Sequence, residues 1–232
     1  LDSEVSAGEI LGYGFQHVAV ATGARWRDDG VGRWHLRPIA LDGVEVLTPD
    51  DLLAGRRPGG DRVLLFDDDH YYLGGALAEL LAAEGRAVTL VTPAVRVSEW
   101  TVNTMEHPRI HRRLVEVGVD LVTAHALAGV DGGIARLACV YTRRERQLAC
   151  DAVVLVTARL PQYALAEELF ARRDAWADSG LLSVCAVGDA LAPSTIAAAV
   201  WDGRRYAEEL DAPDAGDGVP FLREVVRLAA SS

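Results

Sequence analysis

The middle of the chain alternates between short apolar runs and one stripe of leucines at helical spacing. The run Val63–Phe66 has the length and residue types of a buried strand. Gly85 ends the helical stripe, and the apolar run Ala87–Val91 follows it. The stripe consists of Leu73, Leu77, Leu80 and Leu81. This order predicts a β-α-β unit, in which a helix connects two parallel strands.

Similar patterning predicts the elements that follow. Pro108 begins a short helix and Gly118 ends it. The continuous apolar run Ala152–Val156 is typical of a strand that is covered on both faces. Between them, three runs predict a small antiparallel meander with a turn at residues 131–133. These runs are Leu127–Val130, Ala135–Thr142 and Arg146–Ala149.

The flanks of this region contribute one buried strand each, His17–Ala21 and Ser183–Val187. We expect Pro161 to open a helix that reaches residue 171, and the segment Phe221–Ala229 to be amphipathic. A longer helix is expected over residues 194–210, with a buried face. That face consists of Ile196, Ala199, Val200, Gly203, Ala207 and Leu210. The predicted organisation is discontinuous: residues 61–159 are inserted into a unit made of residues 1–60 and 160–232.

Acidic side chains occupy the first turn of the β-α-β unit. In dinucleotide-binding proteins this turn carries G-x-G-x-x-G, because glycines let the backbone approach a pyrophosphate. Here the three glycine positions are Asp67, Asp69 and Tyr72. Two like charges about 4 Å apart repel each other by about 1–4 kcal/mol, depending on the dielectric. The sequence therefore predicts that this turn does not hold a dinucleotide.

Other interpretations of this turn are weaker or plainer. A divalent cation would need ligands besides adjacent aspartates. Asp69 could instead cap the helix while Asp67 and Asp68 are solvated or pair with arginines. A bound NAD would also require an acidic residue after the second strand. That strand is followed by Thr92 and no acid, so the unit is expected to be a vestigial nucleotide-binding module.

Composition narrows the class of partner. The formal net charge is −11, which argues against nucleic acid or an anionic membrane as a partner. Cys139, Cys150 and Cys185 match no metal-site spacing, and the histidines are too scattered for zinc. With no signal peptide and no long apolar run, we expect a cytoplasmic setting. Because Met105 is the only methionine and Leu1 is first, we expect a piece of a longer protein.

Several stretches resemble one family of flavoproteins. They are VAVATGARW (18–26), RVLLFDDDHYYLGG (62–75), VTLVTP (88–93), WTVNTMEHPRIHRRL (100–114), VVLVTARL (153–160) and VGDALAPSTIAAAVWDGRR (187–205). Together they resemble the C-terminal region of the trimethylamine, dimethylamine and histamine dehydrogenases, which is of the glutathione reductase type. The resemblance implies an α/β fold. It consists of an NAD(P)-binding-like unit with an antiparallel meander, inserted into a partial FAD/ADP-binding-like three-layer domain.

The resemblance also implies cofactors and partners. Family members combine a (β/α)₈ barrel, which carries covalent FMN and an iron–sulfur cluster, with a reductase-like C-terminal part. They oxidise amines by N-demethylation or deamination and pass electrons to an electron-transferring flavoprotein. The expected partners of this chain are therefore the barrel of the parent protein and the electron-transferring flavoprotein. A homodimer is also suggested by the resemblance.

The resemblance assigns candidate residues in the outer unit. Tyr13 matches a tyrosine on the docking surface for the electron-transferring flavoprotein; packing of a turn tyrosine on Phe15 is the plainer interpretation. The candidate cofactor-binding residues, facing ADP, are Thr22, Gly23, Ala24, Gly188, Asp189 and Thr195. The same residues are equally consistent with a plainer interpretation, in which the glycines form turns and a side chain caps the following helix. No catalytic residue and no metal ligand are predicted.

Two functions remain open at this point. The first is a non-catalytic part of a flavin-dependent amine dehydrogenase, which is structural or binds ADP. The alternative is an active NAD(P)H-binding reductase domain that delivers hydride to a flavin. The acidic turn at Asp67 and Asp69 favours the first function.

Overall fold

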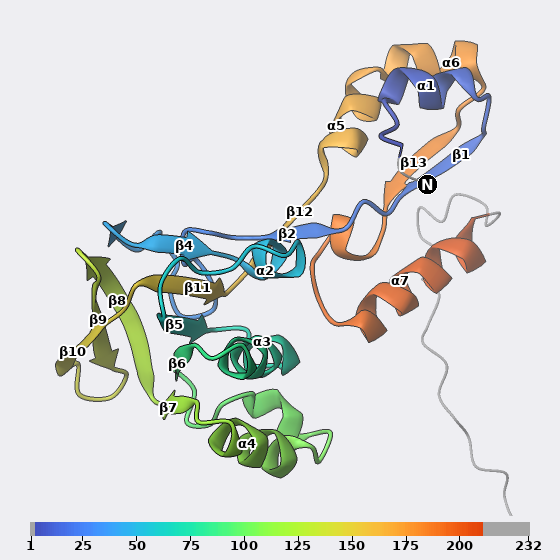
Figure 1. The fold of residues 1–232 in the computed structure, drawn as a ribbon. Coiled ribbons are helices and arrows are strands. Elements are labelled where there is room, and N and C mark those ends of the chain that lie inside the picture. Colours follow the sequence, from blue (N-terminus) through green and yellow to red (C-terminus); the bar gives the residue numbers. More distant parts are fainter. Residues whose placement is uncertain (1–2, 211–232) are drawn as a thin grey trace, which may run out of the picture. The chain divides into compact units, whose positions relative to one another are not determined.

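The structure is a computed structural model that describes residues 3–210 (Figure 1). The described residues divide into two compact units, one formed by residues 3–25 with 160–210 and the other by residues 26–159. The strands β2 (Ala24–Trp26) and β12 (Arg159–Pro161) pair where the chain passes between the units. We describe each unit by itself.

A five-stranded parallel sheet forms the centre of the 26–159 unit, with strand order β4-β11-β5-β6-β7. Its strands are β4 (Glu45–Leu47), β5 (Arg62–Asp67), β6 (Ala87–Val91), β7 (Asp120–Val122) and β11 (Ala152–Val156). The helix α3 (Tyr72–Ala83) connects β5 to β6, and α4 (His107–Glu116) connects β6 to β7. The predicted β-α-β unit and the helix after it are therefore confirmed.

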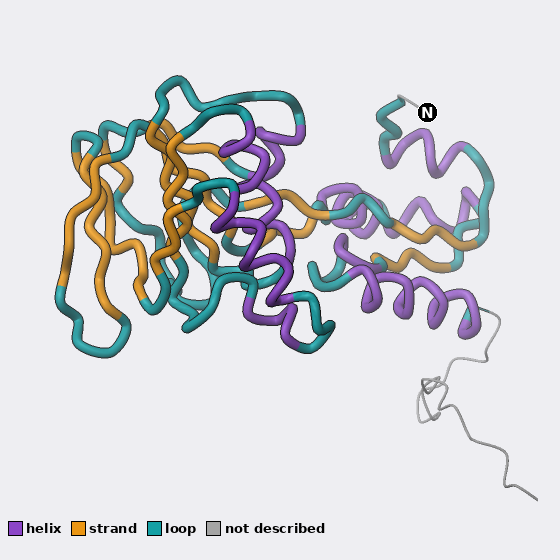
Figure 2. The backbone as a smooth tube through the Cα atoms, turned by 60° about the horizontal axis from the view of Figure 1, so that its bottom comes forward, coloured by secondary structure: helices purple, strands orange, loops and turns teal. Residues whose placement is uncertain are grey.

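A second sheet of four strands has the order β10-β9-β8-β3. Its strands are β3 (Leu41–Asp42), β8 (His125–Asp131), β9 (Ile134–Cys139) and β10 (Glu145–Ala149). The pairs β8–β9 and β9–β10 are antiparallel, as predicted for the meander. The tube trace in Figure 2 follows these strands and the helices of the unit. Two short helical elements complete it, α2 (Pro49–Leu53) and η1 (Glu99–Val102).

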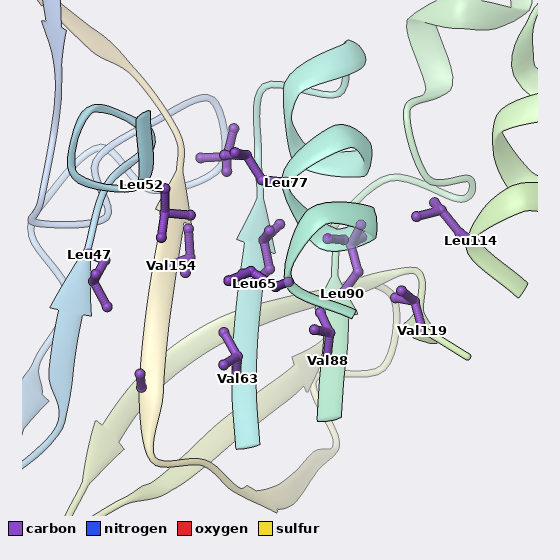
Figure 3. Packing of buried hydrophobic residues seen from close by; sticks show 14 of the residues in the cluster. Leu47, Leu52, Val63, Leu65, Leu77, Val88, Leu90, Leu114, Val119 and Val154 are labelled. Carbon is purple, nitrogen blue, oxygen red and sulfur yellow. The ribbon is translucent and has the colours of Figure 1, made fainter. Parts of the chain in front are cut away.

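The central strands are buried on both faces because their alternate residues serve two cores. Val63 and Leu65 of β5 point into a core that includes Leu77 of α3 and Leu114 of α4 (Figure 3). Leu64 and Phe66 belong to a second core, with residues of β8 and β9. The unit therefore has three layers: the helices cover one face of the parallel sheet, and the mostly antiparallel sheet covers its other face. Leu80, expected in the helical core stripe, is 37% exposed.

The predicted domain boundary at residue 60 is wrong. Residues 26–60 belong to the unit that contains residues 61–159. The cause is two short strands that the sequence pattern did not reveal. β4 pairs with β11 at the edge of the parallel sheet, and β3 pairs with β8 in the other sheet.

The other unit contains a two-stranded parallel sheet of β1 (His17–Val20) and β13 (Ser183–Ala186). Its helices are α1 (Ala7–Gly12), α5 (Ala164–Ala171), α6 (Trp176–Ser179) and α7 (Ile196–Glu209), with 3-10 turns η2 (Arg173–Ala175) and η3 (Gly188–Ala190). A small core joins Ala7, Val20, Ala166 and Leu169. Ser6 caps α1 through a capping box with Glu9, and these hydrogen bonds stabilise the N-terminal end of the helix.

Two expectations for this unit are wrong. Pro161 ends β12 and does not open a helix; α5 begins at Ala164. The expected buried face of α7 is exposed, since Ile196 is 85% and Val200 is 67% exposed and no residue of α7 is buried. Periodicity identified the apolar side of this helix, but it could not show whether other residues bury that side. The predicted amphipathic segment 221–229 lies outside the described residues.

We expect Leu65→Ala to lower the free energy of unfolding by about 2–5 kcal/mol, because its fully buried side chain would leave a cavity in the helix-facing core. Leu53→Ala is the matched control, because Leu53 is 70% exposed. Urea unfolding followed by circular dichroism measures both changes. Equal losses in the two variants would contradict this assignment of the core.

Candidate functional site

The carboxyl edge of the parallel sheet is where ligands bind in α/β folds of this kind. Asp67 is the last residue of β5, Thr92 follows β6, and Thr157 follows β11. All three side chains are buried. The residues of this edge therefore decide whether the unit can hold a nucleotide.

Asp67 fills the first glycine position with its own side chain. It is fully buried, and its Oδ1 accepts hydrogen bonds from the backbone N–H groups of Asp69 (3.2 Å) and His70 (3.0 Å). Its Oδ2 has no hydrogen-bond partner. The carboxylate thus takes two of the turn's backbone donors, which are the groups that a phosphate would need.

Gly74 makes room for this carboxylate on helix α3. A Cβ at position 74 would lie 2.5 Å from Cγ of Asp67, which no real contact tolerates. Position 74 therefore requires glycine because helix α3 lies against the Asp67 side chain, and no cofactor is needed to explain this glycine.

Asp68 is also fully buried, and the loop that follows β2 covers it. Its Oδ2 accepts a hydrogen bond from the backbone N–H of Trp34 at 2.8 Å. A Cβ at Gly32 would lie 2.4 Å from the same oxygen. The loop backbone therefore occupies the space above the carboxylate.

His70 links this cluster to the next strand. Its backbone has a left-handed conformation, with φ of 65°, which is uncommon for a residue other than glycine. Its Nε2 lies 3.4 Å from Oδ1 of Asp68, and its Nδ1 lies 3.2 Å from Oγ1 of Thr92. The side chain is mostly buried, so the ring closes the gap between the ends of β5 and β6.

The expected cap of α3 is wrong. The residue before the helix is Tyr71, and no side chain caps the helix. Asp69 instead lies among charged groups, including Arg33 and Arg159, and burial raises its pKa. Tyr72, at the last glycine position, is 36% exposed, and its hydroxyl donates to the Glu106 carboxylate.

Burial changes the protonation of this cluster. Loss of water around Asp67 raises its pKa from 3.8 to about 6, against the opposing effects of its backbone hydrogen bonds and of His70. An added anion would face Asp67, Asp68 and Asp69 at one edge. The site therefore opposes a diphosphate both sterically and electrostatically.

The outer unit brings its candidate residues to one sheet edge. Thr22, Gly23 and Ala24 follow β1, and Gly188 and Asp189 follow β13, which is its parallel neighbour. Gly23 and Gly188 both have positive φ, 77° and 60°. The structure thus places the two predicted segments on the same side of the pair, although it shows no ligand there.

Most polar groups of these candidates have internal partners. The Thr22 hydroxyl donates to the carbonyl of Gln162, and the Gly188 N–H donates to Asp202 at 2.7 Å. Asp189 accepts from the Ser194 N–H at 3.0 Å. Thr195 caps α7 by accepting from the Ala198 N–H. These contacts fit turn and cap roles; their role toward ADP stays a prediction.

Tyr13 lies at the C-terminal end of α1 and is 58% exposed. Its ring contacts Phe15 edge-on, with centroids 5.9 Å apart. The contact with Phe15 is present, and both rings remain available to solvent.

Residues 3–210 were compared with the requirements of a metal site and of a membrane-spanning helix. Within that range, no group of three or more His, Cys, Asp or Glu residues could hold a metal ion. Cys139, Cys150 and Cys185 are free thiols there. None of the helices in the same range combines the length and apolar character needed to cross a membrane.

The fold defines the class of protein. The chain matches the HOCl-induced flavoprotein disulfide reductase of Escherichia coli with a TM-score of 0.53 at 19% identity, over 86% of this chain and 44% of that one. At that identity the match shows the fold alone. It is an α/β fold with parallel sheets, similar to the nucleotide-binding domains of flavoprotein reductases. Residues 47–150 also match the family model "OYE-like second alpha/beta domain".

More similar proteins define the family. Dimethylamine dehydrogenase of Hyphomicrobium sp. (strain x) is 32% identical over 95% of this chain and 33% of its own length. Histamine dehydrogenase from Rhizobium sp. 4-9 is 45% identical, with a TM-score of 0.92 over 99% of this chain and 36% of that one. The 6-hydroxypseudooxynicotine amine oxidase of Pseudomonas geniculata N1 is 42% identical, with a TM-score of 0.82 over 88% of this chain and 30% of that one.

This chain is homologous to the C-terminal part of the dimethylamine and histamine dehydrogenase family. It spans about a third of the length of these relatives. The predicted family resemblance is therefore confirmed.

Sequence reasoning missed the covering loop and His70. A signal for the covered turn was present in Gly74, which stands two residues after Tyr72, the last glycine position of the nucleotide-binding motif. The contact between Trp34 and Asp68 joins residues 34 positions apart and leaves no local pattern.

The raised pKa of Asp67 predicts a pH dependence of stability. Its folded pKa of about 6 exceeds the unfolded value, so the folded state binds more protons between about pH 4 and 6. The free energy of unfolding should therefore fall as pH rises through this window, by at most about 3 kcal/mol. Asp67→Asn should reduce this slope and leave the smaller part that comes from Asp69, whose pKa is also raised by burial.

Chemical unfolding at half-unit pH steps measures this difference. Asp131→Asn, which changes an exposed carboxyl of β8, is the control. A slope in Asp67→Asn as steep as in the unchanged chain would contradict the assignment.

Gly74→Ala should destabilise the chain by about 1–3 kcal/mol, because the added methyl group overlaps the Asp67 carboxylate. Combining it with Asp67→Gly should recover part of the loss, as a positive coupling in a double-mutant cycle. Gly203→Ala is the control, because no atom lies within 4 Å of its added Cβ. Strict additivity of the two changes would argue against the contact.

Proposed function

We propose that this chain is a non-catalytic part of a flavin-dependent amine dehydrogenase. The observation that carries this proposal is the carboxyl edge of the parallel sheet. Two fully buried aspartates, Asp67 and Asp68, and a covering loop occupy the position of a pyrophosphate. A reductase domain needs that position for its nicotinamide cofactor. The role that remains is structural, with ADP as the nucleotide compatible with the outer unit.

The amine chemistry is proposed from the relatives. Their names describe oxidation of dimethylamine, histamine and 6-hydroxypseudooxynicotine, and the chain covers about a third of each. In the proposed parent, FMN would accept the electrons of the amine, and an iron–sulfur cluster would transfer them to the electron-transferring flavoprotein. Within residues 3–210, Cys139 ends β9, Cys150 follows β10 and Cys185 lies in β13, and none belongs to a group of residues that could hold a metal ion.

The proposed partners are the barrel of the parent protein and an electron-transferring flavoprotein, with a homodimer as the assembly. Tyr13 and Phe15 support the second contact, because exposed aromatic rings suit protein interfaces. ADP is proposed at Thr22–Ala24 and Gly188–Asp189, where the two glycines permit close backbone approach.

The alternative function is an active NAD(P)H-binding reductase domain. The flavoprotein-reductase fold favours it. The burial of Asp67 and the contact of Trp34 with Asp68 oppose it, because both would have to be displaced by the cofactor.

Isothermal titration of the chain with NADH, NADPH and ADP tests the two functions. We expect no binding of NADH or NADPH with Kd below about 1 mM, because displacing the buried cluster exceeds the roughly 4 kcal/mol that such binding supplies. Micromolar NADH binding that Asp67→Asn strengthens would instead support the reductase function. ADP binding that is lost in Gly188→Val, where a side chain meets Ala199 and positive φ, would support the ADP site.

A further inference from the structure

One exposed surface of the 26–159 unit combines aromatic, apolar and cationic side chains. It is formed by the loop after β2 and by the turn between β9 and β10. Its members, which we call the Trp34–Tyr141 surface, are Arg33, Trp34, Leu36, Arg37, Tyr141 and Arg143. Leu36 is 86% exposed and Tyr141 is 71% exposed. These are high values for large apolar side chains, and exposed apolar patches mark interaction sites.

The two segments of this surface are held together and held in place. The guanidinium of Arg143 lies over the Trp34 ring, 5.3 Å from its centroid. The Trp34 N–H donates to the buried Asp68, and the Gly32 N–H donates to the His35 carbonyl at 2.9 Å. Arg143 adopts a left-handed backbone with φ of 61°. The surface is therefore pre-organised, which lowers the entropy lost on binding.

The charge of the surface is opposite to that of the chain. The formal net charge is −11, yet the surface carries three arginines and no carboxylate. Within residues 3–210, Arg33, Arg37 and Arg143 form no ion pair with a carboxylate, whereas arginines such as Arg27, Arg62 and Arg113 do. The charge of Arg33 also acts on Asp69, where it opposes the rise in pKa that burial causes. Three cations are thus left to attract a negatively charged group.

The composition of the surface favours a protein as its occupant. Arginine, tryptophan and tyrosine are the residues that contribute most at protein interfaces, and an apolar centre with a charged rim is their usual arrangement. A second copy of this chain fits poorly. A symmetric contact would bring two copies of the same positively charged surface together, which repel.

We propose that the Trp34–Tyr141 surface binds an acidic protein surface that offers an apolar recess to Leu36 and Tyr141. Resting on the proposed function, we assign this partner role to the electron-accepting flavoprotein. The arginines steer the encounter and align the partner, and the apolar side chains supply most of the contact energy.

Calorimetric titration with purified electron-transferring flavoprotein from the source organism tests this assignment. The charge variant is Arg33→Glu/Arg37→Glu, and the apolar variant is Leu36→Ala/Tyr141→Ala. We expect each to weaken binding by about 10–100-fold, with a charge effect that shrinks as salt rises. The matched control is Arg109→Glu/Arg112→Glu, which changes the same charge on α4, where Arg112 is 75% exposed. Circular dichroism checks that every variant is folded.

The outcomes separate this inference from the proposed function. Losses in both surface variants, with binding by the control as in the unchanged chain, support it. Unchanged binding by the surface variants overturns it while the proposed partner stands, and a loss confined to Tyr13→Ala then assigns docking to Tyr13. Equal losses in surface and control variants also overturn it, because only net charge then matters. Absence of binding by the unchanged chain overturns the proposed partner and this inference together.

Sedimentation velocity adds one further outcome. If the unchanged chain self-associates and Leu36→Ala/Tyr141→Ala abolishes the association, the surface is a contact between copies. That result would overturn the assignment to an acidic partner.

Discussion

The structure of the 26–159 unit depends on how one buried carboxylate is accommodated. Asp67 ends the central strand without exposure to water, and desolvation of its charge is unfavourable. Two backbone N–H groups of the following turn offset part of this cost, and proton uptake at mildly acidic pH offsets more. The same turn, with glycine in place of Asp67, would present those donors to a phosphate. The chain therefore uses internally the hydrogen bonds that related folds direct at a ligand.

Strong local patterns explain what the sequence could predict. β5, β6 and β11 are continuous apolar runs because both of their faces are buried, and such runs have few other interpretations. The capping boxes at Ser6 and Thr48 likewise appear as short motifs. β3 and β4 were missed because they have two and three residues and are fixed by pairing with distant strands. Because they were absent from the predicted sheet, the predicted boundary was displaced by about a quarter of the unit.

The candidate site was predicted in its composition but not in its geometry. The sequence itself shows acidic residues in place of the motif's glycines, and Asp67 and Asp68 are buried at the expected edge of the sheet. The loop that carries Trp34 could not be placed there, since three strands and a helix lie between Trp34 and Asp68 in the sequence. For α7 the reverse held: its apolar face was identified, and its exposure was not. Periodicity reports which side of a helix is apolar, whereas burial depends on neighbours that periodicity does not describe.

The close approach of Gly74 to Asp67 couples the residues allowed at these two positions. Glycine at position 67 alone would open a void beneath α3, and a larger residue at position 74 alone would collide with the carboxylate. Either single step passes through a less stable protein, so the two positions are constrained to change together. Asp67 therefore has two roles at once: its side chain occupies the turn's backbone donors, and it is part of the packing that holds the helix.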